Sequence, residues 1–134
     1  MTESRFMVNP EWENPDEWVE MAGHDLNSAT ILFNENGYPD IIIYHCHQCV
    51  EKTIKAILIK QNTPFEKTHK LDLLIQLVKH NLFDKFKDDI LYLDGFRTKT
   101  RYPFGDTIST KQAGQCVTIC RKIYEAVKPM FIKR

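Results

Sequence analysis

Apolar side chains recur every three or four positions along most of the chain, which is the spacing of one face of an α-helix. The predicted helices run from Pro15 until Gly37, from Pro39 or Asp40 to Gln61, from Lys70 to His80, from Phe83 to Phe96, and from Ser109 to near Pro129. Strand signals are weak throughout, and short connections between amphipathic helices favour antiparallel neighbours. The sequence therefore predicts one all-α domain over residues 1–134: an up-and-down bundle of four to five helices, with a loosely ordered segment at residues 1–13.

Residues that cap helices mark several of the predicted starts. Asn14 precedes a proline and is followed three residues later by Glu17, and Ser109 stands three residues before Gln112. Both arrangements are typical of a helix N-terminus. Thr68 is placed to cap the third helix. The residues from 98 to 108, which contain a proline and a glycine, are predicted to form an ordered loop.

The composition is that of an ordinary globular protein, with 43% hydrophobic and 27% charged residues. No apolar run approaches the length of a membrane span, because Ile41 to Ile43 are soon followed by His45 and His47. The first residues lack the basic-then-apolar layout of a secretory signal. With four cysteines, these features predict a cytoplasmic protein with free thiols and no membrane partner.

The net charge of zero hides an asymmetry along the chain. Residues 1–40 hold nine acidic side chains and one basic one, a net of −8, and the remainder has a net of +8. This split is consistent with an electropositive surface on the later helices. It is equally consistent with acidic side chains of the first helix that pair with basic neighbours.

The second predicted helix carries a polar stripe within a partly apolar surface. At about 100° per residue, His45, Gln48, Lys52 and Lys55 fall on one side of the helix. A cationic strip in such a setting suits an anion site or an interface with a partner. Glu51 and Lys55 are predicted to be a surface helix pair rather than an acid–base couple.

Two cysteine pairs have spacings that a zinc site on facing helices would allow: Cys46 with Cys49, and Cys116 with Cys120. Three of the four cysteines fall on apolar helix faces, where a free cysteine behaves as a small hydrophobic residue. His47 lies on the same apolar side and is predicted to be a hydrogen-bonded core residue. The sequence therefore predicts neither a metal ion nor a cofactor.

His69 stands between Lys67 and Lys70 at a predicted helix start, where free backbone amides favour anions. A helix-cap or turn contact explains His69 as well.

The segment R-T-K-T-R-Y, from Arg97 to Tyr102, places three cations beside an aromatic ring. Arginine binds phosphate with two parallel hydrogen bonds and tyrosine stacks on bases, so this segment is a candidate for nucleotide or RNA contact. Alternatively, Arg101 pairs with an internal carboxylate such as Asp25 while Tyr102 packs against the bundle. Elsewhere in the chain, the glycine-rich phosphate loop, the H-E-x-x-H pair and the nucleophile elbow are all missing.

Four short motifs resemble those of the HEPN domain family, the "higher eukaryotes and prokaryotes nucleotide-binding" domains. They are a D-L-x-x-A piece that begins at Asp25, Q-C-V-E-K-T-I-K-A from Gln48 to Ala56, K-T-H-K-L from Lys67 to Leu71, and T-R-Y-P from Thr100 to Pro103. The resemblance covers the chain from about Trp18 to Val127. It implies an α-helical bundle, commonly dimeric, whose members are often encoded beside a minimal nucleotidyltransferase in toxin–antitoxin-like modules.

Many members of the family are metal-independent ribonucleases with an arginine and, a few residues later, a histidine near the start of the last helix. That motif is absent here, because no histidine follows His80 and neither Arg97 nor Arg101 has its partner. Cys49 occupies a position that is usually a small alanine, in agreement with a packing role. The resemblance therefore implies the non-catalytic branch of the family.

The leading prediction is a non-catalytic, dimeric module that binds a nucleotide or a nucleic acid, or serves a nucleotidyltransferase partner. Its predicted ligand-binding residues are Gln48, Lys52, Lys55, Lys67, His69, Arg97, Arg101 and Tyr102. The alternative is a metal-independent ribonuclease in which His45 or His69 of one subunit lies near Arg101 of the other. A third possibility makes the stripe on the second helix a seam between subunits.

Overall fold

The computed structural model describes residues 7–100 and 107–131. Within them the α-helices are α1 (Pro15–Asn34), α2 (Pro39–Lys60), α3 (Leu71–Leu77), α4 (Lys87–Asp94) and α5 (Thr110–Val127). The short elements are the 3₁₀ turns η1 (Pro10–Trp12), η2 (Asp84–Phe86) and η3 (Lys128–Met130), with the two-residue strands β1 (Met7–Val8) and β2 (Phe65–Glu66). The prediction of an all-α bundle is confirmed.

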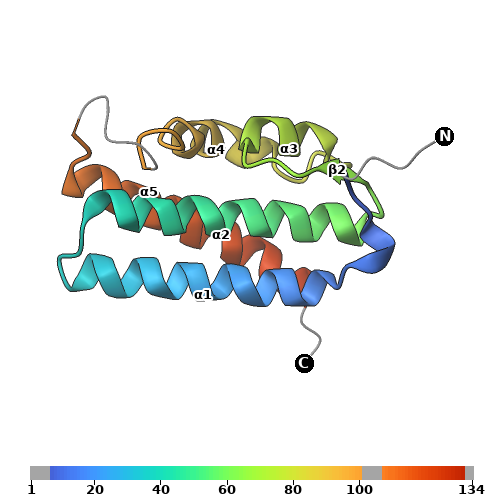
Figure 1. Cartoon of the computed structure of the whole chain (residues 1–134), viewed down its shortest axis with the longest axis horizontal. Coiled ribbons are helices and arrows are strands. Elements are labelled where there is room, and N and C mark those ends of the chain that lie inside the picture. The colour runs from blue at the N-terminus through green and yellow to red at the C-terminus, as the bar shows by residue number, and fades with distance from the viewer. Residues whose placement is uncertain (1–6, 101–106, 132–134) are drawn as a thin grey trace.

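Helix α2 is the centre of the bundle (Figure 1). It packs along its length against α1, α5 crosses behind these two helices, and α3 and α4 follow one another along the other side of α2. Because it is covered on several sides, α2 carries more buried residues than a surface helix with a single apolar stripe. The fully buried aliphatic residues of α2 include Ile42, Ile43, Val50, Ile54, Ile57 and Leu58. One narrow strip of α2 is left between α1 and the α3–α4 side.

Capping residues start two of the long helices where the sequence predicts. The Asn14 side chain accepts a hydrogen bond from the backbone N–H of Asp16 at 3.0 Å, at the start of α1. Ser109 and Gln112 form a complete capping box at the start of α5. These bonds satisfy backbone donors that the first helical turn leaves free.

The third helix is shorter than predicted, because it ends at Leu77 and not at His80. His80 and Asn81 have left-handed φ angles of 68° and 54°, which an α-helix cannot contain. The Gln61 side chain holds the preceding residue in place: it accepts from the Lys79 N–H at 2.8 Å and donates to the Lys79 carbonyl at 3.1 Å.

Strands β1 and β2 pair in antiparallel register, Met7 with Glu66 and Val8 with Phe65. Residues 7–13 therefore contain a strand and the turn η1, which corrects the expectation of loose order for this part of the N-terminal segment. The expected loop at residues 98–108 lies partly outside the described residues, since 101–106 are not among them.

All four cysteines are free and fully buried in the core, as the packing interpretation predicts. Burial, and to a smaller degree the neighbouring Cys46, raise the pKa of the Cys116 thiol to about 12. None of the helices in the described residues is both long enough and apolar enough to cross a membrane.

Candidate functional site

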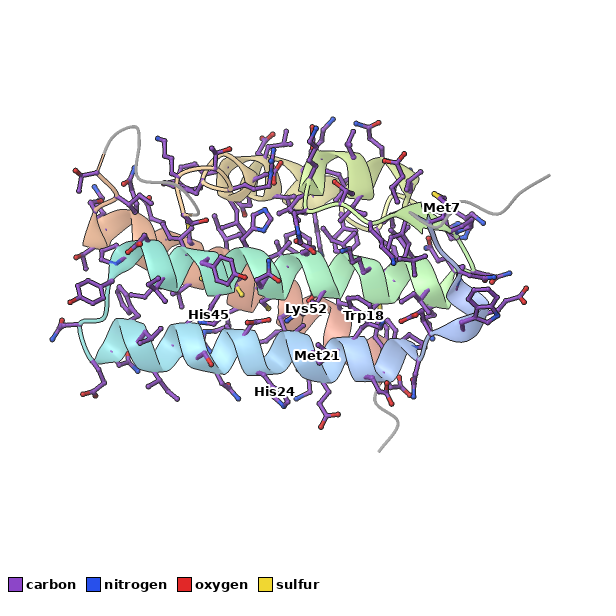
Figure 2. All side chains as sticks on the ribbon, viewed as in Figure 1. Met7, Trp18, Met21, His24, His45 and Lys52 are labelled. Carbon is purple, nitrogen blue, oxygen red and sulfur yellow. The ribbon has the colours of Figure 1, made fainter. Side chains whose placement is uncertain are left out.

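The polar stripe of α2 divides between two carboxylates. His45 and Lys52 lie along the side of α2 that faces α1 (Figure 2). There Asp25 accepts a hydrogen bond from Lys52 Nζ at 2.6 Å, and its other oxygen lies 2.9 Å from His45 Nδ1. Asp25 is the residue that interrupts the apolar pattern of the first helix. It is buried between α1 and α2, and these two contacts balance its charge and satisfy its oxygens.

Lys55 is buried rather than exposed, with 7% of its surface accessible. Its ammonium donates to Glu51 Oε2 at 2.8 Å and lies 5.8 Å from the centre of the Trp18 ring and 5.9 Å from that of Phe65. The prediction that Glu51 and Lys55 form a surface pair is therefore wrong. Trp18 of α1 and Phe65 of β2 cover this part of α2, and neither neighbour can be inferred from helical spacing.

Glu51 also joins α2 to the segment before α3. His69 Nδ1 lies 3.0 and 3.1 Å from its two oxygens, while the His69 side chain is 61% exposed. His69 thus makes a tertiary contact with Glu51, rather than the helix-cap or turn contact that the sequence also allows. A single tautomer follows if His69 is neutral, because an Nδ1–H that donates to the carboxylate leaves Nε2 as the proton acceptor.

His47 is fully buried, and its Nε2 lies 2.9 Å from Asp94 Oδ1. This confirms the predicted hydrogen-bonded core histidine. Asp94 Oδ1 also accepts from the Leu71 N–H at 3.2 Å and from Arg97 Nε at 3.3 Å. Burial alone raises the pKa of the Asp94 carboxyl, but the hydrogen bonds from His47 and Leu71 and the charges of His47 and Arg97 outweigh burial, so its pKa lies below the ordinary value.

These contacts form two neighbouring hydrogen-bonded groups, Glu51 with Lys55 and His69, and Asp94 with His47 and Arg97, which together we call the polar network. The Nδ1 of His47 lies 3.8 Å from Glu51 Oε1, beyond hydrogen-bond distance, and this buried atom has no hydrogen-bond partner among the described residues. The network brings together three stretches that are far apart in sequence: the middle of α2, the K-T-H-K-L segment and the end of α4. Sequence reasoning missed Asp94. The sequence feature that could have revealed Asp94 is its position in the last turn of a predicted helix. The helix dipole disfavours a negative charge there, so such a carboxylate is expected to have a compensating partner.

Four cations stand within a few residues of the two segments that Asp94 joins, and we call them the basic edge: Lys67, Lys70, Arg97 and Lys99. Asp94 places the two contributing segments side by side, because it binds both the Leu71 N–H and the Arg97 guanidinium. The three lysines are exposed, and Arg97 is half-buried. The first segment is the one that carries His69.

The acidic residues among positions 1–40 pair only in part with cations of the later helices. Asp25 binds Lys52, whereas Asp16, Glu17 and Glu20 on the exposed side of α1 form no ion pair within the described part of the chain. Both interpretations of the charge asymmetry therefore apply, each to different residues.

The other predicted site residues are less well placed or lie outside the described residues. Gln48 is half-buried on α2, between the residues that contact Asp25 and those that contact Glu51. Its buried amide nitrogen has no hydrogen-bond partner among the described residues. Arg101 and Tyr102 lie outside the described residues, so their approach to Lys52 stays a prediction. No group of three or more His, Cys, Asp or Glu side chains in residues 7–100 and 107–131 is arranged to hold a metal ion.

Comparison with known proteins agrees with the fold and with the motifs. The HEPN domain model matches residues 15–130. Over 50 residues, 37% of this chain, the sequence is 42% identical to "Putative toxin MJ1304" of Methanocaldococcus jannaschii, and this match covers 32% of that protein's length.

Two solved structures have a similar fold. TT1696 from Thermus thermophilus superposes with a TM-score of 0.75 at 18% identity, over 86% of this chain and 96% of that one. ST0689, an archaeal HEPN homologue, gives a TM-score of 0.70 at 20% identity, over 90% of this chain and 99% of that one. The family match spans nearly the whole helical bundle, including the polar network and the basic edge. The chain belongs to the HEPN domain family.

Proposed function

We propose that this HEPN domain is a non-catalytic module that binds the phosphates of a nucleotide or nucleic acid at the basic edge. The observation that carries the proposal is that Asp94 binds both of the segments that hold Lys67, Lys70, Arg97 and Lys99. Exposed lysines bring little desolvation cost to a phosphate contact, and an arginine can add directed hydrogen bonds.

Lys52 and Lys55 are not among the phosphate-binding residues that we propose, although the sequence suggests both. Lys52 and Lys55 each hold a carboxylate at short distance, so binding a phosphate there would leave Asp25 or Glu51 without its cation in a largely buried setting. We therefore assign a structural role to these two lysines. Of the ligand-binding residues that the sequence predicts, we keep Lys67, His69 and Arg97, and Arg101 and Tyr102 stay predictions. We add Lys70 and Lys99 to the proposed site.

We also propose that the domain works in a toxin–antitoxin-like system. The support for this is the similarity to a relative named as a putative toxin, a match that covers about a third of that protein's length. In this setting the domain acts in the cytoplasm as a homodimer, and a minimal nucleotidyltransferase encoded beside it is the expected partner. Co-expression of the two chains followed by size-exclusion chromatography tests the pairing, and separate elution of the two contradicts it.

The binding itself is tested with a fluorescently labelled single-stranded RNA and anisotropy titrations at several salt concentrations. Lys67→Glu/Lys70→Glu is expected to weaken binding about tenfold and to reduce the slope of log affinity against log salt by about 1.4, since each phosphate contact to a single strand contributes about 0.7 to that slope through counterion release. Lys128→Glu, an exposed lysine on η3, is the control and should change little. Affinity that does not depend on salt, or equal losses in both variants, contradicts the proposal.

One observation favours the ribonuclease alternative as a second candidate. In the Glu51–His69 pair, a buried carboxylate orients an exposed imidazole beside the basic edge, which is how carboxylate–histidine pairs prepare a general base. If this candidate holds, RNA incubated in chelator is cleaved, and His69→Ala abolishes cleavage while RNA affinity falls no more than about twofold. Intact RNA at protein excess leaves the non-catalytic proposal in place.

A further inference from the structure

A separate cavity lies between α3 and α4, and it runs beside α3 from Asp72 to Val78. Its volume is about 370 Å³. Ile75, Val78, Leu82, Phe83 and Leu91 supply its apolar walls, and Asp72, Gln76, Asn81, Asp84 and Lys87 supply its polar ones. This volume is within the range of pockets that hold side chains or small ligands.

The polar side chains of this cavity have few partners inside the chain. One oxygen of Asp72 accepts from the Leu73 N–H, at 2.9 Å, and within the described residues neither the Asp84 nor the Lys87 side chain has a hydrogen bond or ion pair. Two carboxylates against one ammonium leave the rim with negative charge. An apolar floor with an acidic rim matches an aliphatic side chain flanked by a positive one, and it repels phosphate.

The surface next to the cavity is also apolar. Leu73 and Leu77 on the outer face of α3 are 40% and 43% exposed, and Leu91 at the cavity wall is 40% exposed. These three leucines extend the apolar surface of the cavity onto the neighbouring outer faces of α3 and α4.

The backbone beside the cavity contains a strained turn that hydrogen bonds from Gln61 fix in place. His80 and Asn81 are consecutive non-glycine residues in the left-handed region, and Asn81 lines the cavity. Gln61 fixes Lys79 just before them through both of its backbone groups. Strained backbone persists where the surrounding structure fixes it, and it is concentrated at functional sites.

From these observations we infer that the α3–α4 cavity docks a partner protein, through a segment that inserts an aliphatic side chain into the cavity and sets a lysine or arginine between Asp72 and Asp84. The occupant is a protein segment and not a nucleic acid, because the rim is acidic. This surface is distinct from the basic edge and does not depend on the function proposed for it. The bundle would then present two faces, one for a polyanion and one for a basic protein segment.

The test uses three capped dipeptides as probes in amide NMR titrations of the full chain: acetyl-Leu-Arg-amide, acetyl-Leu-Gln-amide and acetyl-Ala-Arg-amide. The Leu-Arg probe is expected to shift amide signals of residues 72–91 and to bind about three- to fivefold more tightly than either of the others, the size expected for an exposed ion pair or a partly buried aliphatic group. Equal binding of Leu-Arg and Leu-Gln, shifts outside residues 72–91, or a preference for added uridine monophosphate would each overturn the inference.

Charge variants give matched controls. Asp72→Asn/Asp84→Asn should remove the preference for Leu-Arg, whereas Glu35→Gln/Glu125→Gln, the same charge change at exposed positions elsewhere, should keep it. Lys87→Glu should strengthen Leu-Arg binding, which a general loss of folding cannot imitate. A preference that survives Asp72→Asn/Asp84→Asn, or weaker binding by Lys87→Glu, would overturn the inference as well.

Discussion

Replacing Glu51 with alanine is expected to lower the free energy of unfolding by about 3–5 kcal/mol, the largest effect of any substitution in the polar network. The change leaves the Lys55 ammonium buried against Trp18 and Phe65 without a counter-charge, and it removes the partner of His69. Urea denaturation followed by circular dichroism measures the loss as a shift in the midpoint at unchanged slope.

Asp89 and Lys122 provide the control for this prediction. Their ion pair has nearly the same length, 2.7 Å against 2.8 Å for Glu51 and Lys55, but the Lys122 and Asp89 side chains are 53% and 35% exposed, against 9% and 4% for Lys55 and Glu51. Asp89→Ala is expected to cost less than about 1 kcal/mol, because solvent screens exposed pairs and replaces their hydrogen bonds. If Asp89→Ala and Glu51→Ala destabilise the chain equally, Glu51 and Lys55 are not buried as described.

Asp94→Ala is expected to lower the free energy of unfolding by about 2–4 kcal/mol. It removes the acceptor of the fully buried His47 and of the Leu71 N–H, so that helices α2, α3 and α4 lose their common contact. Asp94→Asn keeps an acceptor oxygen without the charge and should recover part of this loss. The two variants are compared by thermal and urea denaturation at neutral pH.

The contribution of Asp94 to the free energy of unfolding is expected to decrease as the pH falls. Because the pKa of Asp94 is lowered in the folded chain, the unfolded chain binds its proton first as the pH falls. The stabilisation by Asp94 is therefore complete above the ordinary aspartate pKa and is lost as the pH falls through the lowered one. Asp94→Asn should show a smaller loss of stability over this acidic range than the unchanged protein. An identical acid profile for both would mean that the carboxylate is not held in its charged form.

The helices of this bundle could be predicted from the sequence because their signals are local. Apolar periodicity depends only on neighbours along the chain, and the caps at Asn14 and Ser109 are formed within three residues. The end of α3 could not be placed, since the turn at His80 has no glycine or proline to mark it and is held by Gln61 from another helix.

The site was harder to predict because periodicity tells which side of α2 a residue occupies, but not what covers that side. Helical spacing groups Gln48, Lys52 and Lys55 on one side, yet Asp25 neutralises Lys52 from α1 while Glu51 and Phe65 enclose Lys55. The cover over Lys55 includes a strand of two residues, too short for an alternating pattern. The motifs of the family resemblance thus hold residues that build the core as well as residues that face solvent.

We propose that residues of these motifs and their neighbours divide into an inward polar network and an outward basic edge that binds phosphate. The most direct test is an amide NMR titration of the chain with a short single-stranded RNA, which locates the contact without any substitution. We expect salt-sensitive shifts concentrated at residues 67–71 and 97–100, with little change along α1. Shifts concentrated around His45 and Lys52, or no shifts at millimolar RNA in low salt, would contradict it.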